Sequence, residues 1–277
     1  MGTGVLPAYI KVSAPRFPGN FPLHYDNGYT GYVLTKVAAP AISDNHSMSS
    51  LQHNPRETLG PRDIMARLAP RYGQITWRPG NDPVPELVLT ILSQHTSDVN
   101  ADRAFRHLLS RFDSLEAVAQ APVDDIAESI RNGGLARIKA PRIKAVLNHI
   151  LEDRGKLDLD FLRELPLDEA KAWLTALPGV GKKTAAVVLC FSLGMPAMAV
   201  DTHVHRVSRR LGLIGDKTSA DQAHDLLEDM VAPQEVYRFH VYLITHGRQV
   251  CKAQRPLCEG CPLADGCPTG RERLAIV

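Results

Sequence analysis

Four cysteines near the end of the chain have the residue type and the spacing of a metal-binding site. They form the array C-x6-C-x2-C-x5-C, so that four of the five cysteines lie within seventeen positions: Cys251, Cys258, Cys261 and Cys267. Four thiolates this close together can bind one iron–sulfur cluster or one zinc ion. Zinc sites usually have two well-separated C-x2-4-C pairs, whereas here three unequal gaps close one compact loop. The spacing therefore favours the cluster.

A glycine-rich segment, LPGVGKKTAAVV at residues 177–188, has the composition of a phosphate-binding turn. Gly179 and Gly181 permit a tight turn that brings the backbone close to a ligand. A helix that begins near Lys182 would direct its unpaired N–H groups and the positive end of its dipole at the same ligand. The pattern looks like the hairpin of a helix–hairpin–helix motif, which binds DNA backbones irrespective of sequence. A simple glycine-rich connection between two helices is the alternative.

The order of the motifs resembles the endonuclease III family of DNA repair glycosylases, over roughly residues 60–270. The family pattern has a hairpin lysine, an aspartate eighteen residues later, the tripeptide HGR and four cysteines. Here these features are Lys183, Asp201 in VDTHVHRV, residues 246–248 and the C-x6-C-x2-C-x5-C array. The resemblance is to the branch of helix–hairpin–helix glycosylases that carries an iron–sulfur cluster. It implies a [4Fe–4S] cluster held by the four cysteines.

The resemblance also implies the catalytic residues. Lys183 would attack C1′ of the damaged nucleotide, form a Schiff base and allow β-elimination at the 3′ phosphate. Asp201 would stabilise the positive charge that develops on the sugar and assist proton transfer. Asp201 also precedes an apolar-periodic segment, where an aspartate is a good helix N-cap.

The lysine chemistry sets a condition on its surroundings. A lysine amine is almost entirely protonated at neutral pH, and it becomes nucleophilic when burial or a neighbouring positive charge disfavours the ammonium form. Lys182 and the helix N-terminus would act in this direction, whereas the carboxylate of Asp201 would act against it. Desolvation is therefore expected to outweigh the aspartate, or the aspartate is expected to lie nearer the sugar.

Duplex DNA is the partner that the resemblance implies. The hairpin residues expected to contact its backbone are Gly179, Val180, Gly181, Lys182 and Thr184. Lys252 and Arg255 in the cysteine loop are expected to add basic contacts, because positive side chains neutralise phosphates.

A glycosylase of this kind flips the damaged nucleotide out of the stack, and side chains must fill the gap. Leu135, in GLARIKA at residues 134–140, is the candidate wedge. In the other gap-filling loop, ILSQHTSDV, an ungapped alignment puts His95 at the family's glutamine although Gln94 is adjacent. Either side chain could enter the gap. Asp98 in the same loop is expected to be a helix cap.

Composition alone does not indicate a nucleic-acid-binding protein, because the formal net charge of +2 is close to neutral. A local basic group without acidic residues is either a phosphate-binding surface or a solvated helix face: Arg131, Arg137, Lys139, Arg142 and Lys144. No apolar run approaches the ~20 residues of a membrane span. The thiol-rich site and the lack of a signal peptide predict a reducing compartment, the cytoplasm, with association to the nucleoid.

From residue 61 onward, apolar residues recur every three or four positions, which predicts an all-α protein of about ten short helices. Residues 1–58 lack this period and are predicted to be disordered or loosely attached. We expect two helical lobes in a monomer, one from 76–195 and one from 59–75 with 196–277. DNA would lie between them, with the catalytic lysine and aspartate facing each other.

The sequence thus predicts a bifunctional DNA glycosylase and AP lyase that removes oxidised pyrimidines such as thymine glycol. The stretch at residues 157–177 is longer than in the bacterial enzyme, in the manner of plant 5-methylcytosine glycosylases. A glycosylase for mismatched thymine or 5-methylcytosine is therefore an alternative. A non-catalytic, cluster-bearing DNA-binding protein is an alternative of a different class.

Overall fold

The computed structural model describes residues 58–275, and every regular element in this part of the chain is helical, which confirms the predicted all-α class. The α-helices are α1 (Pro61–Tyr72), α2 (Pro83–Ser93), α3 (Asp98–Phe112), α4 (Leu115–Gln120), α5 (Val123–Ser129), α6 (Ala136–Arg154), α7 (Leu167–Thr175), α8 (Lys182–Val187), α9 (Thr202–Arg210), α10 (Ala220–Met230), α11 (Val236–Gln249) and α12 (Pro268–Leu274). The short helical turns are η1 (Arg131–Gly133), η2 (Asp160–Glu164), η3 (Val188–Ser192), η4 (Pro233–Glu235) and η5 (Cys258–Gly260). The expectation for residues 1–58 falls almost wholly outside the described residues. None of the described helices is long and apolar enough to cross a bilayer.

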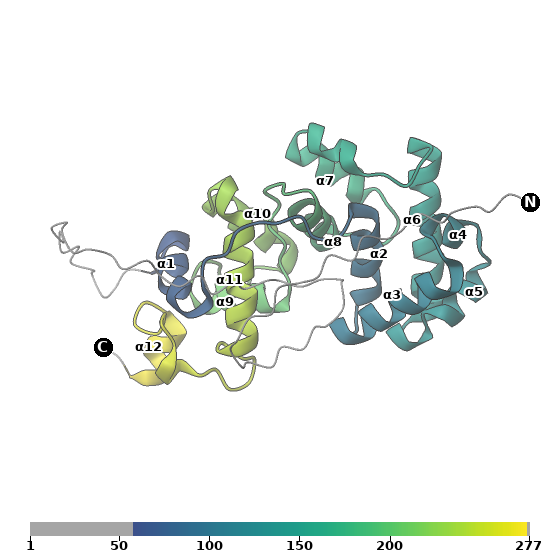
Figure 1. Cartoon of the computed structure of the whole chain (residues 1–277). Coiled ribbons are helices and arrows are strands. Elements are labelled where there is room, and N and C mark those ends of the chain that lie inside the picture. Colours follow the sequence, from purple (N-terminus) through teal and green to yellow (C-terminus); the bar gives the residue numbers. More distant parts are fainter. Residues whose placement is uncertain (1–57, 276–277) are drawn as a thin grey trace, which may run out of the picture.

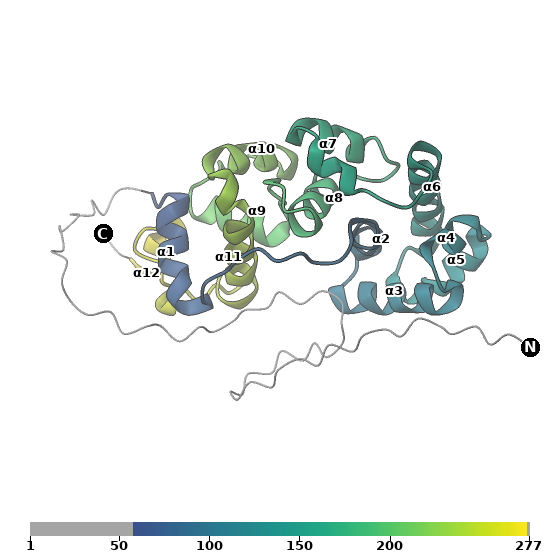
Figure 2. The same ribbon diagram turned by 45° about the horizontal axis from the view of Figure 1, so that its top comes forward.

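The buried apolar side chains form two cores. Helices α2 to α8 build the first core, whose residues come from 84–199. The second core combines α1, α9, α10, α11 and the cysteine loop, with residues from 59–75, 190–191 and 198–267. The two groups of helices lie next to each other along the molecule, and α8 lies between them in both views (Figures 1 and 2).

The helix after the glycine-rich segment joins the two cores. It begins as α8 and continues as η3, a π-helical turn. Leu189 in this turn packs into the first core, whereas Cys190 and Phe191 pack into the second. Such π turns inside helices are often found beside functional sites. The single helical segment from 182 to 192 therefore fixes the hairpin against both cores.

Several boundaries differ from the sequence prediction. Helices α4 and α12 were not predicted, because six or seven residues are too few to show a helical period. Helix α6 begins at Ala136, four residues before the predicted range of 140–153, and it contains Pro141. The cap of α3 is Ser97, whose hydroxyl accepts from the Asn100 N–H at 3.3 Å, and Asp98 is the first residue of the helix. The predicted cap role of Asp98 was therefore wrong.

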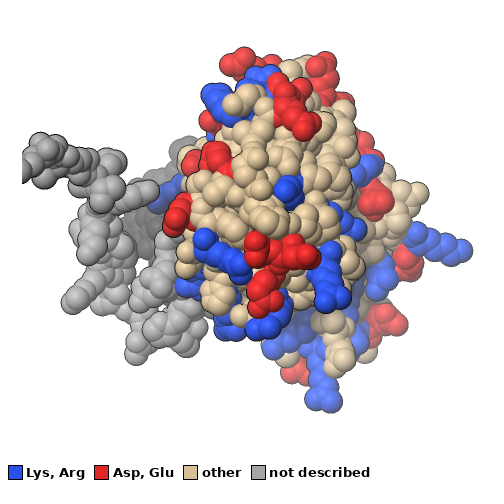
Figure 3. Space-filling view, turned by 90° about the vertical axis from the view of Figure 1, so that its right-hand side faces the viewer, with Lys and Arg blue, Asp and Glu red and all other residues tan. Residues whose placement is uncertain are grey.

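The basic group between 131 and 144 is not one solvated surface. The Lys139 side chain is 1% exposed, and its ammonium donates to backbone carbonyls. Lys144 is half-buried and donates to the carbonyl of Ala121 at 2.7 Å. At the end of the molecule that contains α4 and α5, acidic and basic side chains are interspersed (Figure 3). The group is therefore not a single set of solvent-exposed cations, because two of its five members are engaged with backbone carbonyls.

A buried extended segment leads from η3 to α9 and ends at Asp201. Its backbone groups are paired by side chains, because it has no helix or sheet partner. The Met198 N–H donates to Glu228 Oε2 at 2.8 Å. The imidazole of His224 donates from Nδ1 to the Met198 carbonyl at 2.6 Å, and that of His240 donates to the Ala199 carbonyl at 2.8 Å. These three side chains fix the backbone that delivers Asp201.

We expect the free energy of unfolding to fall as the pH decreases below about 6.5, the ordinary histidine value. Burial lowers the pKa of His224 and of His240, so below that pH the unfolded chain binds more protons than the folded one. The contribution of these two histidines to the free energy of unfolding is therefore fully present above that pH and is lost below it. Urea unfolding between pH 7.5 and 5 measures the effect. His224→Gln keeps an amide donor for the Met198 carbonyl and should show a shallower loss of stability. The matched control is the exposed His107→Gln, which should keep the wild-type slope. Equal slopes in all three proteins would contradict the assignment.

Candidate functional site

The glycine-rich hairpin lies between α7 and α8, and its two glycines are needed for different reasons. Gly179 has φ 76°, and a Cβ there would lie 2.7 Å from Cδ of Arg142, so no other residue fits without a shift. Gly181 is exposed, and a Cβ there would meet no protein atom within 4 Å. Val180 and Thr184 are buried, so the hairpin can offer these two residues only through their backbone. The open side of Gly181 leaves the start of α8 accessible to a ligand.

The two hairpin lysines have different surroundings. Lys182 is paired with the Asp225 carboxylate at 2.7 Å, and this hydrogen bond raises the pKa of Lys182. Lys183 is exposed, and within residues 58–275 its amine has no hydrogen bond or ion pair. The ammonium of Lys182, which was expected to help activate Lys183, is thus paired with Asp225 of α10. The desolvation that Lys183 requires is not supplied by the described residues.

Asp201 is the N-cap of α9, as expected from the sequence. Its Oδ1 accepts from the Val204 N–H at 2.7 Å, and its backbone is extended, which allows the side chain to reach back to the first turn. The second carboxylate oxygen has no hydrogen-bond partner among the described residues. A half-buried carboxylate is thereby held in one orientation with one oxygen available for chemistry.

The charges of Lys183 and Asp201 both act on the buried imidazole of His240. Burial is the main cause that lowers the pKa of His240, the Asp201 charge opposes it, and the charges of Lys183 and Arg248 add to it. Arg248 in turn forms an ion pair with Asp98 of α3 at 2.8 Å. This pair connects the two groups of helices across the site. Sequence reasoning missed His240, although a histidine on the apolar side of a predicted helix was a usable signal.

The two loops predicted to fill a gap in DNA are both exposed and both have unusual backbone. His95 has φ 55° and Leu135 has φ 53°, a left-handed conformation that non-glycine residues adopt infrequently. Leu135 is 48% exposed. Gln94 is instead engaged, because its Nε2 donates to the Gly179 carbonyl at 3.2 Å. The geometry therefore leaves His95 free to reach a ligand, while Gln94 connects its loop to the hairpin.

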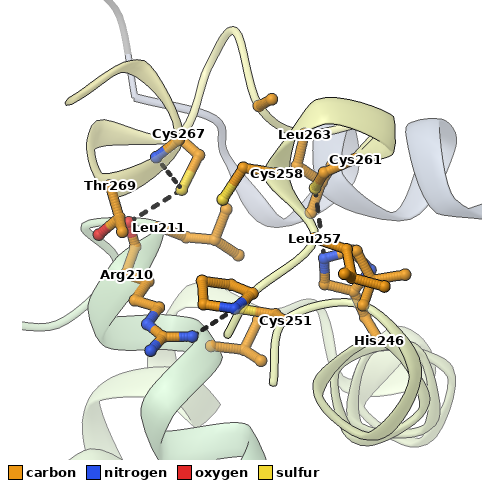
Figure 4. A pocket seen from close by; sticks show the side chains of 15 residues that line it. Arg210, Leu211, His246, Cys251, Leu257, Cys258, Cys261, Leu263, Cys267 and Thr269 are labelled. Carbon is orange, nitrogen blue, oxygen red and sulfur yellow. Dashed lines mark hydrogen bonds between the residues drawn. The ribbon is translucent and has the colours of Figure 1, made fainter. Parts of the chain in front are cut away.

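The four cysteine side chains point into one pocket between α9 and α11 (Figure 4). Two N–H donors are directed at sulfur: Arg210 donates to Sγ of Cys251 at 3.3 Å, and the Gly270 N–H donates to Sγ of Cys267 at 3.4 Å. Between residues 58 and 275, no three His, Cys, Asp or Glu side chains converge on a point that one metal ion could occupy. Thiols that surround a space, with donors directed at them, suit a polynuclear cluster whose iron atoms are ligated separately.

Arginines of α9 bind the backbone of the cysteine loop. Arg206 donates to the carbonyls of Gly247 at 2.9 Å and Cys251 at 3.1 Å. Arg210 donates to the carbonyls of Lys252 and Ala253, each at 2.7 Å. The helix that begins at the Asp201 cap thus ends on the cysteine loop. The guanidinium groups of these two arginines are therefore largely used inside the protein.

The comparisons with known proteins agree with this geometry. Residues 88–233 match the family model of HhH-GPD superfamily base excision DNA repair proteins, and residues 251–267 match the iron-sulfur binding domain of endonuclease III. Endonuclease III of Thermotoga maritima is 36% identical over 193 residues, which cover 69% of this chain and 85% of that protein.

Two solved structures share the fold. A non-covalent endonuclease III–DNA complex is 30% identical with a TM-score of 0.67, covering 78% of this chain and 99% of that chain. A trapped covalent endonuclease III–DNA intermediate, an estranged-adenine complex, is 30% identical with a TM-score of 0.65, covering 77% and 96%.

These matches include the hairpin, the Asp201 segment and the cysteine loop. The four cysteines therefore bind a [4Fe–4S] cluster, and the chain binds DNA. The predicted family and cofactor are confirmed. The chain belongs to the endonuclease III family of the HhH-GPD superfamily, and it is a cluster-bearing DNA glycosylase of base excision repair.

Proposed function

We propose that this glycosylase is also an AP lyase, with Lys183 as its nucleophile and Asp201 as its charge-stabilising carboxylate. The observation that carries the proposal is an exposed lysine amine at the start of α8 without a partner among the described residues, together with an aspartate that caps α9 and keeps one carboxylate oxygen available. The charges of both side chains act on the same buried imidazole, that of His240. The trapped covalent complex of the related endonuclease III supports a covalent step in the family. Bound DNA would cover Lys183 and supply the desolvation that the free chain lacks.

The reaction follows from these positions. The Lys183 amine attacks C1′ as the glycosidic bond breaks, and the base leaves with the electron pair and takes up a proton. Asp201, held by its bond to the Val204 N–H, stabilises the positive sugar. The attached amine then loses a proton, and the C1′–O4′ bond of the sugar breaks with O4′ taking up a proton, which gives an iminium at C1′. The iminium loses a C2′ proton, and a C2′=C3′ double bond forms as the 3′ phosphate leaves with the electrons of its C3′–O bond. The proposed substrate is duplex DNA with an oxidised pyrimidine such as thymine glycol.

The gap left by the flipped nucleotide would be filled by His95 and Leu135. Both side chains are exposed on adjacent loops, whereas Gln94 is bonded to the hairpin carbonyl of Gly179. We therefore favour His95 over Gln94 as the residue that contacts the opposite strand. The backbone N–H groups around Gly181 would bind a phosphate of the lesion strand.

We expect Lys183→Gln to abolish the covalent adduct that borohydride captures on an abasic duplex, because the variant has no amine to form the Schiff base. Gel analysis of the trapped product gives the readout. Lys182→Gln is the matched control, since it removes the same charge at the adjacent position and leaves the nucleophile; it should keep the adduct. The lyase proposal would be wrong if the wild-type protein bound DNA without forming an adduct. If the wild-type protein also excised no base, it would be a non-catalytic DNA-binding protein.

We expect Asp201→Asn to separate the two roles of this residue. Asparagine caps helices about as well as aspartate, so the midpoint of thermal unfolding should remain near that of the wild type. Loss of the charge should slow base excision by about 10²–10⁴-fold. Single-turnover excision of thymine glycol from a duplex measures the effect. A rate equal to wild type, with the cap intact, would mean that Asp201 acts only in the fold.

We further propose that the cluster holds a basic DNA-contacting loop and supports α9. Lys252 and Arg255 are exposed on this loop, and Arg206 and Arg210 bind its carbonyls. The cluster would supply no step of the base-removal chemistry.

Cys258→Ser should remove the cluster absorbance and weaken DNA binding while circular dichroism shows retained helicity. Lys252→Ala should keep the cluster and reduce the salt dependence of binding by about one phosphate contact. Hydrogen exchange of the α9 amides should rise in Cys258→Ser alone. Unchanged DNA affinity in the cluster-free variant would disprove the support role.

A further inference from the structure

A buried ammonium lies behind the two exposed loops. Lys139, in the second turn of α6, is 1% exposed, and its Nζ donates to the carbonyls of Leu92 at 2.6 Å and Gly133 at 2.9 Å. Leu92 lies in the last turn of α2, just ahead of His95. Gly133 ends η1, just ahead of Leu135. One side chain thus spans the bases of both loops.

The two carbonyls belong to helix ends, where backbone oxygens have no partner inside the helix. A positive charge at such ends is favourable, because carbonyls there carry the negative end of the helix dipole. Burial lowers the pKa of Lys139, so these oxygens must compensate for the lost hydration of the ammonium. Burying the ammonium of Lys139 here therefore costs hydration. Its hydrogen bonds are complete only while the carbonyls of Leu92 and Gly133 are both within reach.

The loops that this ammonium joins also have the strained backbone of the site. His95 and Leu135 are two of the four non-glycine residues between 58 and 275 that have positive φ. Strained conformations persist where the surroundings over-determine them, and they concentrate at functional positions. A Cβ on Gly133 would lie 2.9 Å from Cβ of Ala104, so the base of the Leu135 loop is also packed tightly against α3.

We propose that Lys139 is a positioning residue that couples the His95 loop to the Leu135 loop, so that both side chains enter the DNA gap as one rigid unit. This inference rests on the proposed gap-filling roles of these two side chains. Gln94 extends the unit to the hairpin through its bond to the Gly179 carbonyl. The backbone phosphate contact and the gap contact are thereby held at a fixed separation.

The test uses the opposing base as the reporter. A duplex carries a tetrahydrofuran abasic analogue, which cannot react with an amine, opposite 2-aminopurine, whose fluorescence rises when it is unstacked. Entry of the loops should raise the fluorescence with wild-type protein. We expect Lys139→Met to reduce this rise at least about threefold at saturating protein, the size of a modest coupling between contacting groups.

The matched control is Lys144→Met. Lys144 lies on the same helix and also donates to a backbone carbonyl, that of Ala121, but away from both loops. Both variants lose hydrogen bonding from a lysine to a backbone carbonyl, so both should unfold at a lower temperature. Only Lys139→Met should lose the fluorescence rise, and it should still form the borohydride adduct with single-stranded abasic DNA within about twofold of wild type, as expected for an independent site.

Three outcomes would overturn the proposal. The first is a full fluorescence rise with Lys139→Met, and the second is a loss of the rise in both lysine variants in proportion to their loss of folded protein. A wild-type protein that binds the duplex without any rise would overturn the gap-filling roles and this coupling together. Failure of the lyase proposal is a separate result, because it appears as the absence of a wild-type borohydride adduct. If Lys139→Met does not fold, Lys139→Gln takes its place, because its shorter, uncharged side chain weakens the connection between the loops and still offers N–H donors.

Discussion

The site depends on one constraint, which is that buried backbone groups outside helices must find side-chain partners. An unpaired buried donor or acceptor costs about 1–3 kcal/mol. The segment that delivers Asp201, the helix ends beneath the His95 and Leu135 loops and the cysteine loop are all backbone of this kind. Histidine, glutamate, lysine and arginine side chains supply the missing partners: His224, His240, Glu228, Lys139, Arg206 and Arg210.

This pairing explains why an irregular site can be precise. Asp201 and Leu135 lie at a helix N-terminus, and each is two residues from a backbone carbonyl that a buried side chain binds. Asp201 follows the segment held by His240, and Leu135 follows the carbonyl held by Lys139. The helix from 182 to 192 holds the two groups of helices in a fixed relative position, because its π turn packs into both cores.

The sequence was sufficient for features that depend on local pattern. The helical period predicted most helices, the spacing of the cysteines predicted the cluster, and the residues after Asp201 predicted its cap. It was insufficient for features set by distant contacts. Nothing near Lys139 in the sequence shows that its partner carbonyl lies forty-seven residues away at Leu92. The roles of Lys183 and of the gap-filling side chains stay predictions, because geometry places these groups without testing their chemistry.

The second core has a consequence for how the chain folds as it is synthesised. The first core comes from a continuous stretch and can form once residue 199 has emerged. Helix α1 precedes that stretch, yet its partners follow it: Tyr72 bonds to His246, and Arg67 pairs with Asp265. The apolar face of α1 therefore stays exposed to solvent during synthesis until residues 246 and 265 have left the ribosome. The fold is completed when the first described helix packs against α11 and the cysteine loop.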